Sequence, residues 1–181
     1  SAASDVYKRQ DEDYDEALRI LGEVCGVSDR AEELIAYIKQ CLEDLETRTE
    51  SIPDENKPSV LGAAATFKGS HGIEGVYSNY PVFAEIAAKD MAVGISDTVG
   101  GLLVDKEQIL SWNPDMIFLD YSGVELVRAD YAENPDYYQQ LKAFTDGNVY
   151  QWPNSTWHWS NVEIPLVSAY YTAMLLYPDA F

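Results

Sequence analysis

Two stretches near the start of the chain repeat apolar residues at spacings of three and four, the spacing of one α-helix face. The first predicts a short helix over residues 14–24 that ends at Gly26. The second predicts a longer helix over residues 29–50, with Ser28 or Asp29 as its N-terminal cap. At about 1.5 Å per residue, this second helix would be roughly 30–35 Å long and would cross a whole small domain.

After a break with two prolines, the pattern changes to short apolar runs that alternate with helical stretches. Three of these runs predict buried strands, at residues 59–67, 115–120 and 147–152. Further helices are expected near residues 80–87, 105–112, 134–144 and 160–177. Strands that alternate with helices indicate an α/β fold. We expect a three-layer, Rossmann-like lobe with a mostly parallel sheet, preceded by the long helix.

The same pattern divides the chain into four parts. Residues 1–13 are polar and patternless, and we interpret them as a disordered or foreign leader. Residues 14–50 form the helical segment, residues 51–58 a linker, and residues 59–181 one α/β lobe. With 181 residues, of which 46% are hydrophobic, the chain has room for one core.

The charge balance limits the possible partners. The chain has 31 acidic and 12 basic residues, which give a formal net charge of −19. Contacts to phosphates need clustered Lys and Arg, so we exclude a nucleic-acid partner. The two cysteines, Cys25 and Cys41, lack the spacing of metal ligands and are expected to be buried small hydrophobes, with a disulfide left open.

Three loops follow the three predicted strands, at residues 68–77, 121–124 and 153–160. In parallel α/β sheets, ligands bind beyond the carboxyl ends of the strands, where these loops lie. The third loop belongs to an aromatic run, and aromatic residues gathered on a loop usually face a ligand or partner. Ser160 and Glu163 have the spacing of a capping box that would hold this loop firmly. We therefore expect a binding face here; the alternative is that the rings fold onto the core.

Catalysis is a weaker interpretation of these loops. The glycine-rich loop over residues 67–75 lacks the order of a phosphate-binding P-loop. Ser70 and His71 are adjacent, and adjacent side chains rarely point at one another, so they are a poor nucleophile–base pair. The carboxylates Asp115 and Asp120 would lie at opposite ends of one strand and cannot act together. The sequence thus favours binding over an enzyme.

A bare metal ion is a further possibility. The chain has two histidines, His71 and His158, and both fall on the proposed edge. With Glu74 or Asp120 they could ligate zinc. Histidines that hydrogen-bond to the backbone of their own loops are the favoured alternative, so no metal site is predicted.

The order of these features resembles one family. The matching features are the long helix, the strand over residues 59–67, the Phe-Lys-Gly-Ser-His-Gly-Ile-Glu-Gly-Val-Tyr loop, the Asn-Pro-Asp segment with the apolar strand after it, and the terminal Leu-Leu-Tyr-Pro-Asp-Ala-Phe. Together they resemble the substrate-binding proteins of ABC importers for iron–siderophore and cobalamin-type ligands. The resemblance covers about residues 14–181. It implies two α/β lobes joined by a rigid interdomain helix, with the ligand held between the lobes.

The resemblance also implies roles for parts of this chain. The helix over residues 29–50 would be the interdomain helix and residues 59–181 the C-terminal lobe, while the N-terminal lobe and the export signal would lie outside this chain. Glu74, expected at the start of the first helix after the strand over residues 59–67, is the candidate for the surface glutamate that docks onto arginines of the permease. Glu163, which also opens a predicted helix near the same edge, is the alternative. The implied ligand contacts are Lys68, His71, Tyr121, Trp157 and Trp159.

We therefore expect an extracytoplasmic substrate-binding component that captures an iron chelate, such as a siderophore, heme or cobalamin-type complex. It would deliver this ligand to an ABC permease and would have neither catalytic activity nor a cofactor of its own. Contact with the membrane would come only through a lipid anchor on the part outside this chain. The alternatives are a receptor for bare zinc or manganese, which would use both histidines, and a carbohydrate-binding module on Trp152, Trp157 and Trp159.

Overall fold

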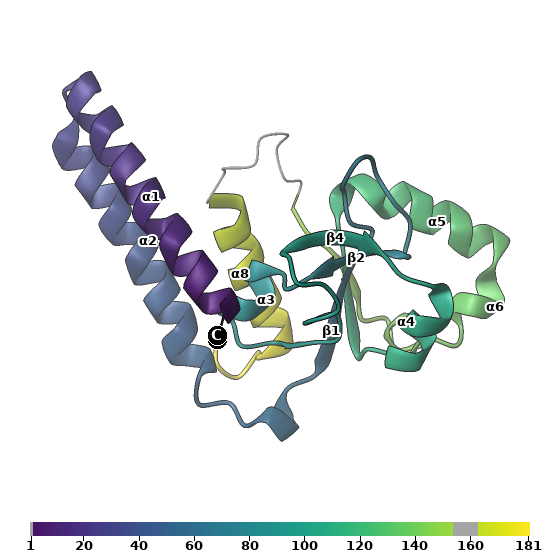
Figure 1. Cartoon of the computed structure of the whole chain (residues 1–181). Coiled ribbons are helices and arrows are strands. Elements are labelled where there is room, and N and C mark those ends of the chain that lie inside the picture. Colours follow the sequence, from purple (N-terminus) through teal and green to yellow (C-terminus); the bar gives the residue numbers. More distant parts are fainter. Residues whose placement is uncertain (1, 154–162) are drawn as a thin grey trace.

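The computed structural model describes residues 2–153 and 163–181, with side chains from residue 12 onward. The first two helices, α1 (Ala2–Cys25) and α2 (Ser28–Thr49), form an antiparallel hairpin. This hairpin runs along one side of the α/β lobe, and its tip projects beyond the lobe (Figure 1). Gly26 makes the turn between the helices, because its φ of 69° lies in the left-handed region that glycine adopts without strain.

Two predictions about the hairpin are wrong. Helix α1 begins at Ala2 and not near residue 14, so residues 2–13 belong to this helix, and a foreign origin of the leader stays a prediction. This stretch has no apolar periodicity, but it also has no glycine or proline that would break a helix. The N-cap of α2 is Val27, which makes no side-chain capping bond, so neither Ser28 nor Asp29 has the predicted capping role.

The inner faces of the hairpin are held by both apolar and charged contacts. Ala31, Ile35 and Leu45 of α2 are buried. Asp15 of α1 is buried as well, and its carboxylate forms a 2.5 Å ion pair with Lys39. The expected burial of the cysteines is only half right among the described residues: Cys41 is half-buried, Cys25 is exposed next to the turn, and both are free thiols.

The three predicted strands are confirmed as β1 (Ser59–Ala63), β5 (Met116–Leu119) and β6 (Val149–Gln151), and they are parallel. Three further strands were missed: β2 (Gly75–Ser78), β3 (Lys89–Asp90) and β4 (Gly100–Leu103). Strands β2 and β4 are antiparallel to their neighbours, and β3 pairs with the start of β1. The sheet has the order β4-β2-β1-β5-β6.

Helices cover both faces of this sheet, as the predicted three-layer fold requires (Figure 1). One face packs against α2, α3 (Pro81–Glu85) and α8 (Glu163–Leu176). The other face packs against helices that follow β4 and β5: α4 (Lys106–Trp112), α5 (Val124–Glu133), α6 (Pro135–Tyr138) and α7 (Lys142–Thr145). Short 3₁₀ turns lie at η1 (Asp54–Asn56) and η2 (Tyr121–Gly123).

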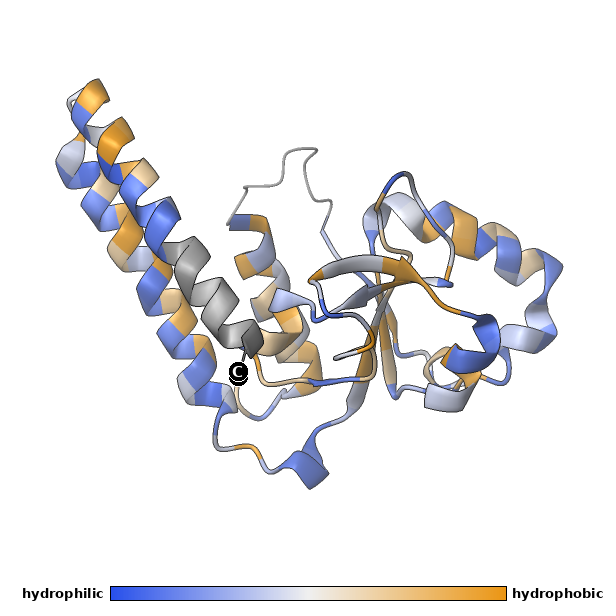
Figure 2. Ribbon diagram, viewed as in Figure 1, coloured by the Kyte–Doolittle hydropathy of each residue, from blue (hydrophilic) through white to orange (hydrophobic). Residues whose placement is uncertain are grey.

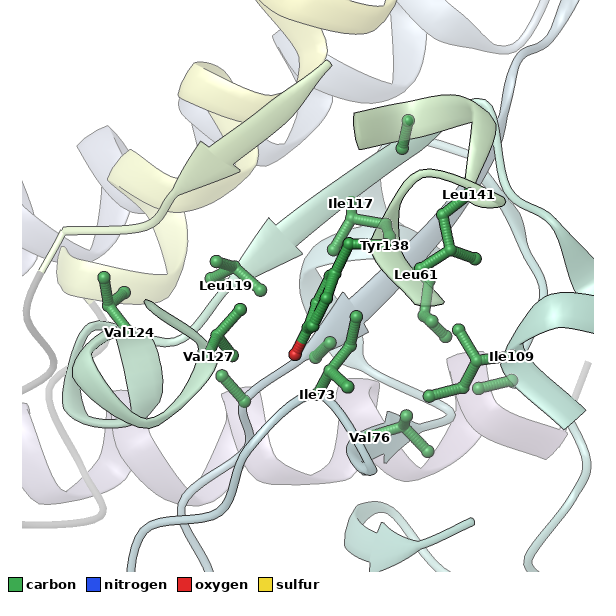
Figure 3. Packing of buried hydrophobic residues seen from close by; sticks show 14 residues of the cluster. Leu61, Ile73, Val76, Ile109, Ile117, Leu119, Val124, Val127, Tyr138 and Leu141 are labelled. Atoms are coloured by element: carbon green, nitrogen blue, oxygen red, sulfur yellow. The ribbon is translucent and has the colours of Figure 1, made fainter. Parts of the chain in front are cut away.

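Alternate residues along the central strands supply these two cores. Leu61 and Ile117 point into the core with α4–α7, where Tyr138 lies fully buried among them (Figure 3). Val60 and Phe118 point into the core with α2, α3 and α8. This alternation follows from the two-residue period of a strand and fixes the register of β1 against β5.

Some helix predictions need correction. The helix expected over residues 134–144 is divided into α6 and α7, and α5 was not predicted at all. Between the two helices the Leu141 backbone is extended, with φ −88° and ψ 119°. The Lys142 amide at the start of α7 donates a 2.8 Å hydrogen bond to the side-chain oxygen of Asn113. None of the described helices combines the length and apolar character needed to cross a bilayer.

Candidate functional site

The loops after β1 and β5 meet at the carboxyl edge of the sheet. Gly123, in the turn after β5, is packed against the carbonyl oxygens of His71 and Ala64 in the loop after β1. A Cβ atom on Gly123 would lie 2.5 Å from the Ala64 oxygen and closer still to the His71 oxygen, so only glycine fits. Two of the three predicted loops are therefore in direct contact. The third, over residues 153–160, lies mostly outside the described residues, as do Trp157, Trp159 and His158.

The loop after β1 closes on itself. Thr66 and Ser70 form an isolated antiparallel bridge, and the Phe67 amide donates a 2.9 Å bond to the Gly69 carbonyl. Lys68 at the tip is exposed and has a φ of 50°, a left-handed conformation that costs energy for a residue with a side chain. The loop thus presents the Lys68 side chain from a tight, constrained turn.

His71 is half-buried beside this turn. Its Nε2 lies 2.8 Å from the Phe67 carbonyl oxygen, and its ring stacks on Phe67 with centroids 4.1 Å apart. The contact to the carbonyl is the backbone-bonded arrangement that we weighed as the alternative to a metal ligand. It orients the imidazole and leaves Nδ1 as the nitrogen for other contacts.

Asp120 connects the loops at this edge through hydrogen bonds. Its carboxylate is buried at the end of β5 and accepts a 2.5 Å bond from the Tyr77 hydroxyl. It also accepts bonds from the Ser122 amide at 2.9 Å and from the Thr66 hydroxyl at 3.4 Å. Burial and the neighbouring carboxylate raise the pKa of Tyr77 far above its ordinary value, so the phenol stays protonated and keeps donating. The sequence prediction missed Tyr77, because it lies on a strand that was not predicted.

Tyr121, which follows Asp120, is half exposed at 50%. It begins η2, whose Asp120 N-cap fixes the backbone through the Ser122 amide. Tyr121 thus presents its ring at the same edge as the loop that carries Lys68 and His71.

The first tryptophan of the aromatic run, Trp152, belongs to the core and not to the binding face. It is 3% exposed and stacks on Phe118, with ring centroids 5.5 Å apart. Its indole Nε1 donates a 2.9 Å hydrogen bond to Thr172 of α8. A carbohydrate-binding surface that uses Trp152 is therefore ruled out, because the ring is not accessible.

Glu74 is not where the prediction expected it. It precedes strand β2, whereas the prediction placed it at the start of a helix. The side chain is half-buried, and its carboxylate accepts a 3.0 Å bond from the Gly72 amide of its own loop. Exposed glutamates in the first turns of helices within this lobe are Glu107, Glu125 and Glu163, and Glu125 pairs with Arg128 at 2.7 Å.

Metal ligation receives little support from the geometry. Within the described ranges, no three His, Cys, Asp or Glu side chains come together in a group that could hold a metal ion. The zinc or manganese hypothesis therefore depends on His158, which lies outside those ranges.

An apolar hollow of about 360 Å³ lies between α5 and the edge strand β6. Its walls include Val127 and Tyr131 from α5 and Phe144 from α7, and it reaches Leu119 and Gln151 at the carboxyl edge. The sequence prediction missed it, because α5 was not predicted.

The opposite edge of the sheet is held by Asp115. Its carboxylate accepts bonds from the Ser59 amide at 2.8 Å and hydroxyl at 2.7 Å, and it forms a 2.5 Å ion pair with Lys142. These bonds outweigh the partial burial and lower the pKa of Asp115 to about 2. Asp115 and Asp120 therefore lie at opposite ends of β5, as predicted, and Asp115 has a structural role.

Comparison with known proteins adds a family and a fold. The family model described as periplasmic binding protein matches residues 3–156. That match begins inside the stretch interpreted as a leader. No curated protein sequence matches the chain.

Several solved structures are similar over nearly the whole chain. A periplasmic solute binding protein from Veillonella parvula has a TM-score of 0.72 and 22% identity over 93% of this chain and 51% of that one. The molybdate periplasmic binding protein MolA of Haemophilus influenzae has a TM-score of 0.70 and 18% identity over 94% of this chain and 51% of that one. An ABC-type Fe³⁺-hydroxamate transport system protein from Saccharomonospora viridis has a TM-score of 0.65 and 17% identity over 89% and 54%. At these identities the likeness establishes the fold, and the chain spans about half the length of each of these proteins.

Proposed function

Because the chain belongs to the periplasmic binding protein family, we propose that it is the C-terminal half of an ABC importer's substrate-binding component. The ligand that we propose is an iron chelate, such as a siderophore, heme or a related cobalamin-type complex. The single observation that carries this proposal is the contact between the loops after β1 and β5. These loops present Lys68, His71 and Tyr121 from one edge of the sheet.

The half-length match supports a second lobe outside this chain. In this proposal, residues 59–181 form the C-terminal lobe, α2 is the interdomain helix, and a second α/β lobe faces the loops that carry the site. A ligand that contacts both lobes would then stabilise the closed arrangement over the open one. A stiff helical connection permits little closure, so specificity would come from preformed loop contacts.

The surface of the hairpin supports this division as well. Figure 2 shows apolar residues on α1 near the tip. Ile20, Leu21 and Val24 of α1 are 54%, 58% and 79% exposed, and Val27, in the turn before α2, is 51% exposed. Apolar side chains clustered on one helix face normally pack against other protein. We propose that the second lobe covers this face.

The chemistry of the edge supports a chelate more than a bare ion. Lys68 offers an exposed cation for an anionic ligand, and Tyr121 offers an exposed ring. Trp157 and Trp159 of the third loop would add aromatic surface. For these two residues the support comes from the sequence alone. A bare zinc or manganese ion is less favoured, because the described residues bring no three ligating side chains together in one group.

The proposed partner is the permease of the importer. Docking through a surface glutamate remains part of the proposal, with Glu74 as the residue expected from the sequence. Glu107 and Glu163 compete with it, because both are exposed in the first turn of a helix. The proposed location is extracytoplasmic, with a lipid anchor on the part of the protein outside this chain.

Uptake and binding by the full-length protein test this function. Titration with ferric hydroxamate, ferric catecholate, ferric citrate, heme and cobalamin should identify one ligand that quenches tryptophan fluorescence. A protein that binds none of these, but binds zinc or manganese, would support the bare-metal receptor instead.

A further inference from the structure

We propose that Asp120 is a positioning residue that locks the two ligand-facing loops together before the ligand arrives. This inference deepens the proposed function and rests on it. Lys68 and His71 lie on the loop after β1, and Tyr121 lies on the turn after β5. The Asp120 carboxylate accepts hydrogen bonds from both loops. None of these bonds comes from the three ligand-facing side chains.

The hydrogen bonds of Asp120 form a closed circuit. The Thr66 amide donates a 3.3 Å bond to the Tyr77 hydroxyl, and that hydroxyl donates a 2.5 Å bond to Asp120 Oδ2. The Thr66 hydroxyl donates a 3.4 Å bond to Asp120 Oδ1, and the Ser122 amide donates a 2.9 Å bond to the same oxygen. The Asp120 carboxylate at the centre of this set is buried, whereas Thr66 is exposed. Hydrogen bonds that meet at a buried carboxylate strengthen one another.

The circuit also connects the loops to a rigid support. The Tyr77 ring stacks on Tyr80, with centroids 4.5 Å apart, and lies 6.2 Å from the ring of buried Trp152. The Asp120 amide donates a 2.9 Å bond to the Ala63 carbonyl, which continues the β1–β5 ladder. Tyr77 is therefore fixed against the core, and Asp120 connects it to the two loops.

Backbone strain in the held loop fits this role. Ala64 and Lys68 have φ values of 58° and 50°, which a residue with a side chain adopts only when its surroundings enforce it. Gly123 allows the turn after β5 to approach the backbone of this strained loop closely. The geometry thus assigns Asp120 to preorganisation, which lowers the ordering cost of binding.

The test compares Asp120→Asn and Tyr77→Phe with Asp115→Asn in the full-length protein. The first two changes break the circuit, because an asparagine replaces one acceptor oxygen with a donor and phenylalanine lacks the hydroxyl. Asp115 lies on the same strand at the opposite edge, where it also accepts several bonds, so its variant is the matched control.

Amide hydrogen exchange gives a readout that needs no ligand. We expect Asp120→Asn and Tyr77→Phe to increase exchange in residues 66–71 and 121–123 by about tenfold, and Asp115→Asn to leave these segments unchanged. A purely structural role of Asp120 would instead increase exchange across the core in Asp120→Asn and Tyr77→Phe, with no preference for the two loops. Unchanged protection of the two loops in Asp120→Asn would overturn the proposal.

Binding kinetics then separate this inference from the proposed function. With whichever chelate the wild type binds, Asp120→Asn should increase the dissociation rate by about tenfold and leave the association rate within about threefold. An unchanged dissociation rate would also overturn the inference. A wild type that binds no chelate would contradict the proposed function, while the exchange experiment would still decide the role of Asp120.

Discussion

The indole Nε1 of Trp152 donates a 2.9 Å hydrogen bond to the hydroxyl of Thr172, which connects the end of β6 to α8. Thr172 is fully buried and donates in turn to the Ser168 carbonyl at 2.6 Å. The start of the aromatic run is therefore anchored in the core immediately before the third loop begins. This anchor fixes where the loop leaves the sheet.

Replacing Thr172 with valine should lower the free energy of unfolding by about 1–3 kcal/mol, because the buried indole N–H loses its acceptor. Thr172→Ser keeps the hydroxyl and loses only a methyl group, so it should cost less. Chemical denaturation of both variants measures the difference. Equal losses would show that the hydrogen bond contributes nothing beyond packing.

Replacing Gly123 with alanine should separate the two loops of the candidate site. The added methyl group would overlap the carbonyl oxygens of Ala64 and His71, so the free energy of unfolding should fall by about 1–3 kcal/mol. Ser122→Ala is the control, because it keeps the amide that donates to Asp120 and alters an exposed side chain. Denaturation midpoints and ligand affinity provide the measurement; a Gly123→Ala protein that matches the control in both would contradict the tight packing.

Asp90 should make stability depend on pH. Burial raises the pKa of Asp90 from 3.8 to about 6, although the Ala92 amide donates to it. The raised value means that folding favours the neutral acid. The contribution of Asp90 is therefore complete below about pH 4 and is lost as the pH rises through about 6.

Asp90→Asn should accordingly match the wild type near pH 4. Near pH 8, it should be more stable by on the order of 2 kcal/mol. Asp97→Asn removes the same charge from an exposed loop position and serves as the control. Urea denaturation at the two pH values decides the matter, and a difference between Asp90→Asn and wild type that does not change with pH would refute the prediction.

The exposed apolar face of α1 allows a test of the proposed second lobe. Val24→Asp should leave the stability of the 181-residue chain nearly unchanged, because Val24 is 79% exposed there. In the full-length protein the same change should cost about 2–4 kcal/mol, because it would bury an unpaired charge. Glu23→Ala, at an exposed neighbour, should be neutral in both. Equal effects of Val24→Asp in the two proteins would mean that nothing covers this face.

Docking onto the permease can be assigned by charge reversal. Glu107→Lys and Glu163→Lys should reduce ligand uptake by the complete importer by about tenfold or more and leave ligand affinity unchanged, because they alter exposed charges at helix starts. Glu74→Lys should affect the loop as well, since it removes the bond to the Gly72 amide. Uptake and affinity are measured together to distinguish the three variants. Normal uptake in all three would show that none of these glutamates docks onto the permease.

The sequence pattern predicted the parts of the fold that have long or strongly apolar signals. The strands β1, β5 and β6 are apolar runs bounded by turns, and α2 has a clear helical period. The missed strands β2 and β4 are four residues each and begin with glycine, so their pattern is too short to stand out. Their place in the sheet depends on pairing with β1 and with each other, which no local pattern encodes.

For the candidate site, the sequence predicted that three loops lie together, and the structure shows this for the loops after β1 and β5. The sequence did not predict how these two loops are held. The ends of β1 and β5 place Lys68, His71 and Tyr121 at one edge. The carboxylate that holds these loops was considered only as a possible metal ligand or acid–base partner, and Tyr77 was hidden on a missed strand. The available signal was an aspartate directly after an apolar strand, where a buried charge needs several donors.

The central claim is that this edge of the sheet binds a metal chelate. Isothermal titration calorimetry of the full-length protein with the ferric chelates, heme and cobalamin tests it most directly, with alanine replacing Lys68, His71, Tyr121, Trp157 and Trp159 one at a time. We expect one ligand to bind with one-to-one stoichiometry and at least three of the five replacements to weaken it by about tenfold or more. A ligand that binds equally well to all five variants, or the failure of every chelate to bind, would contradict the claim.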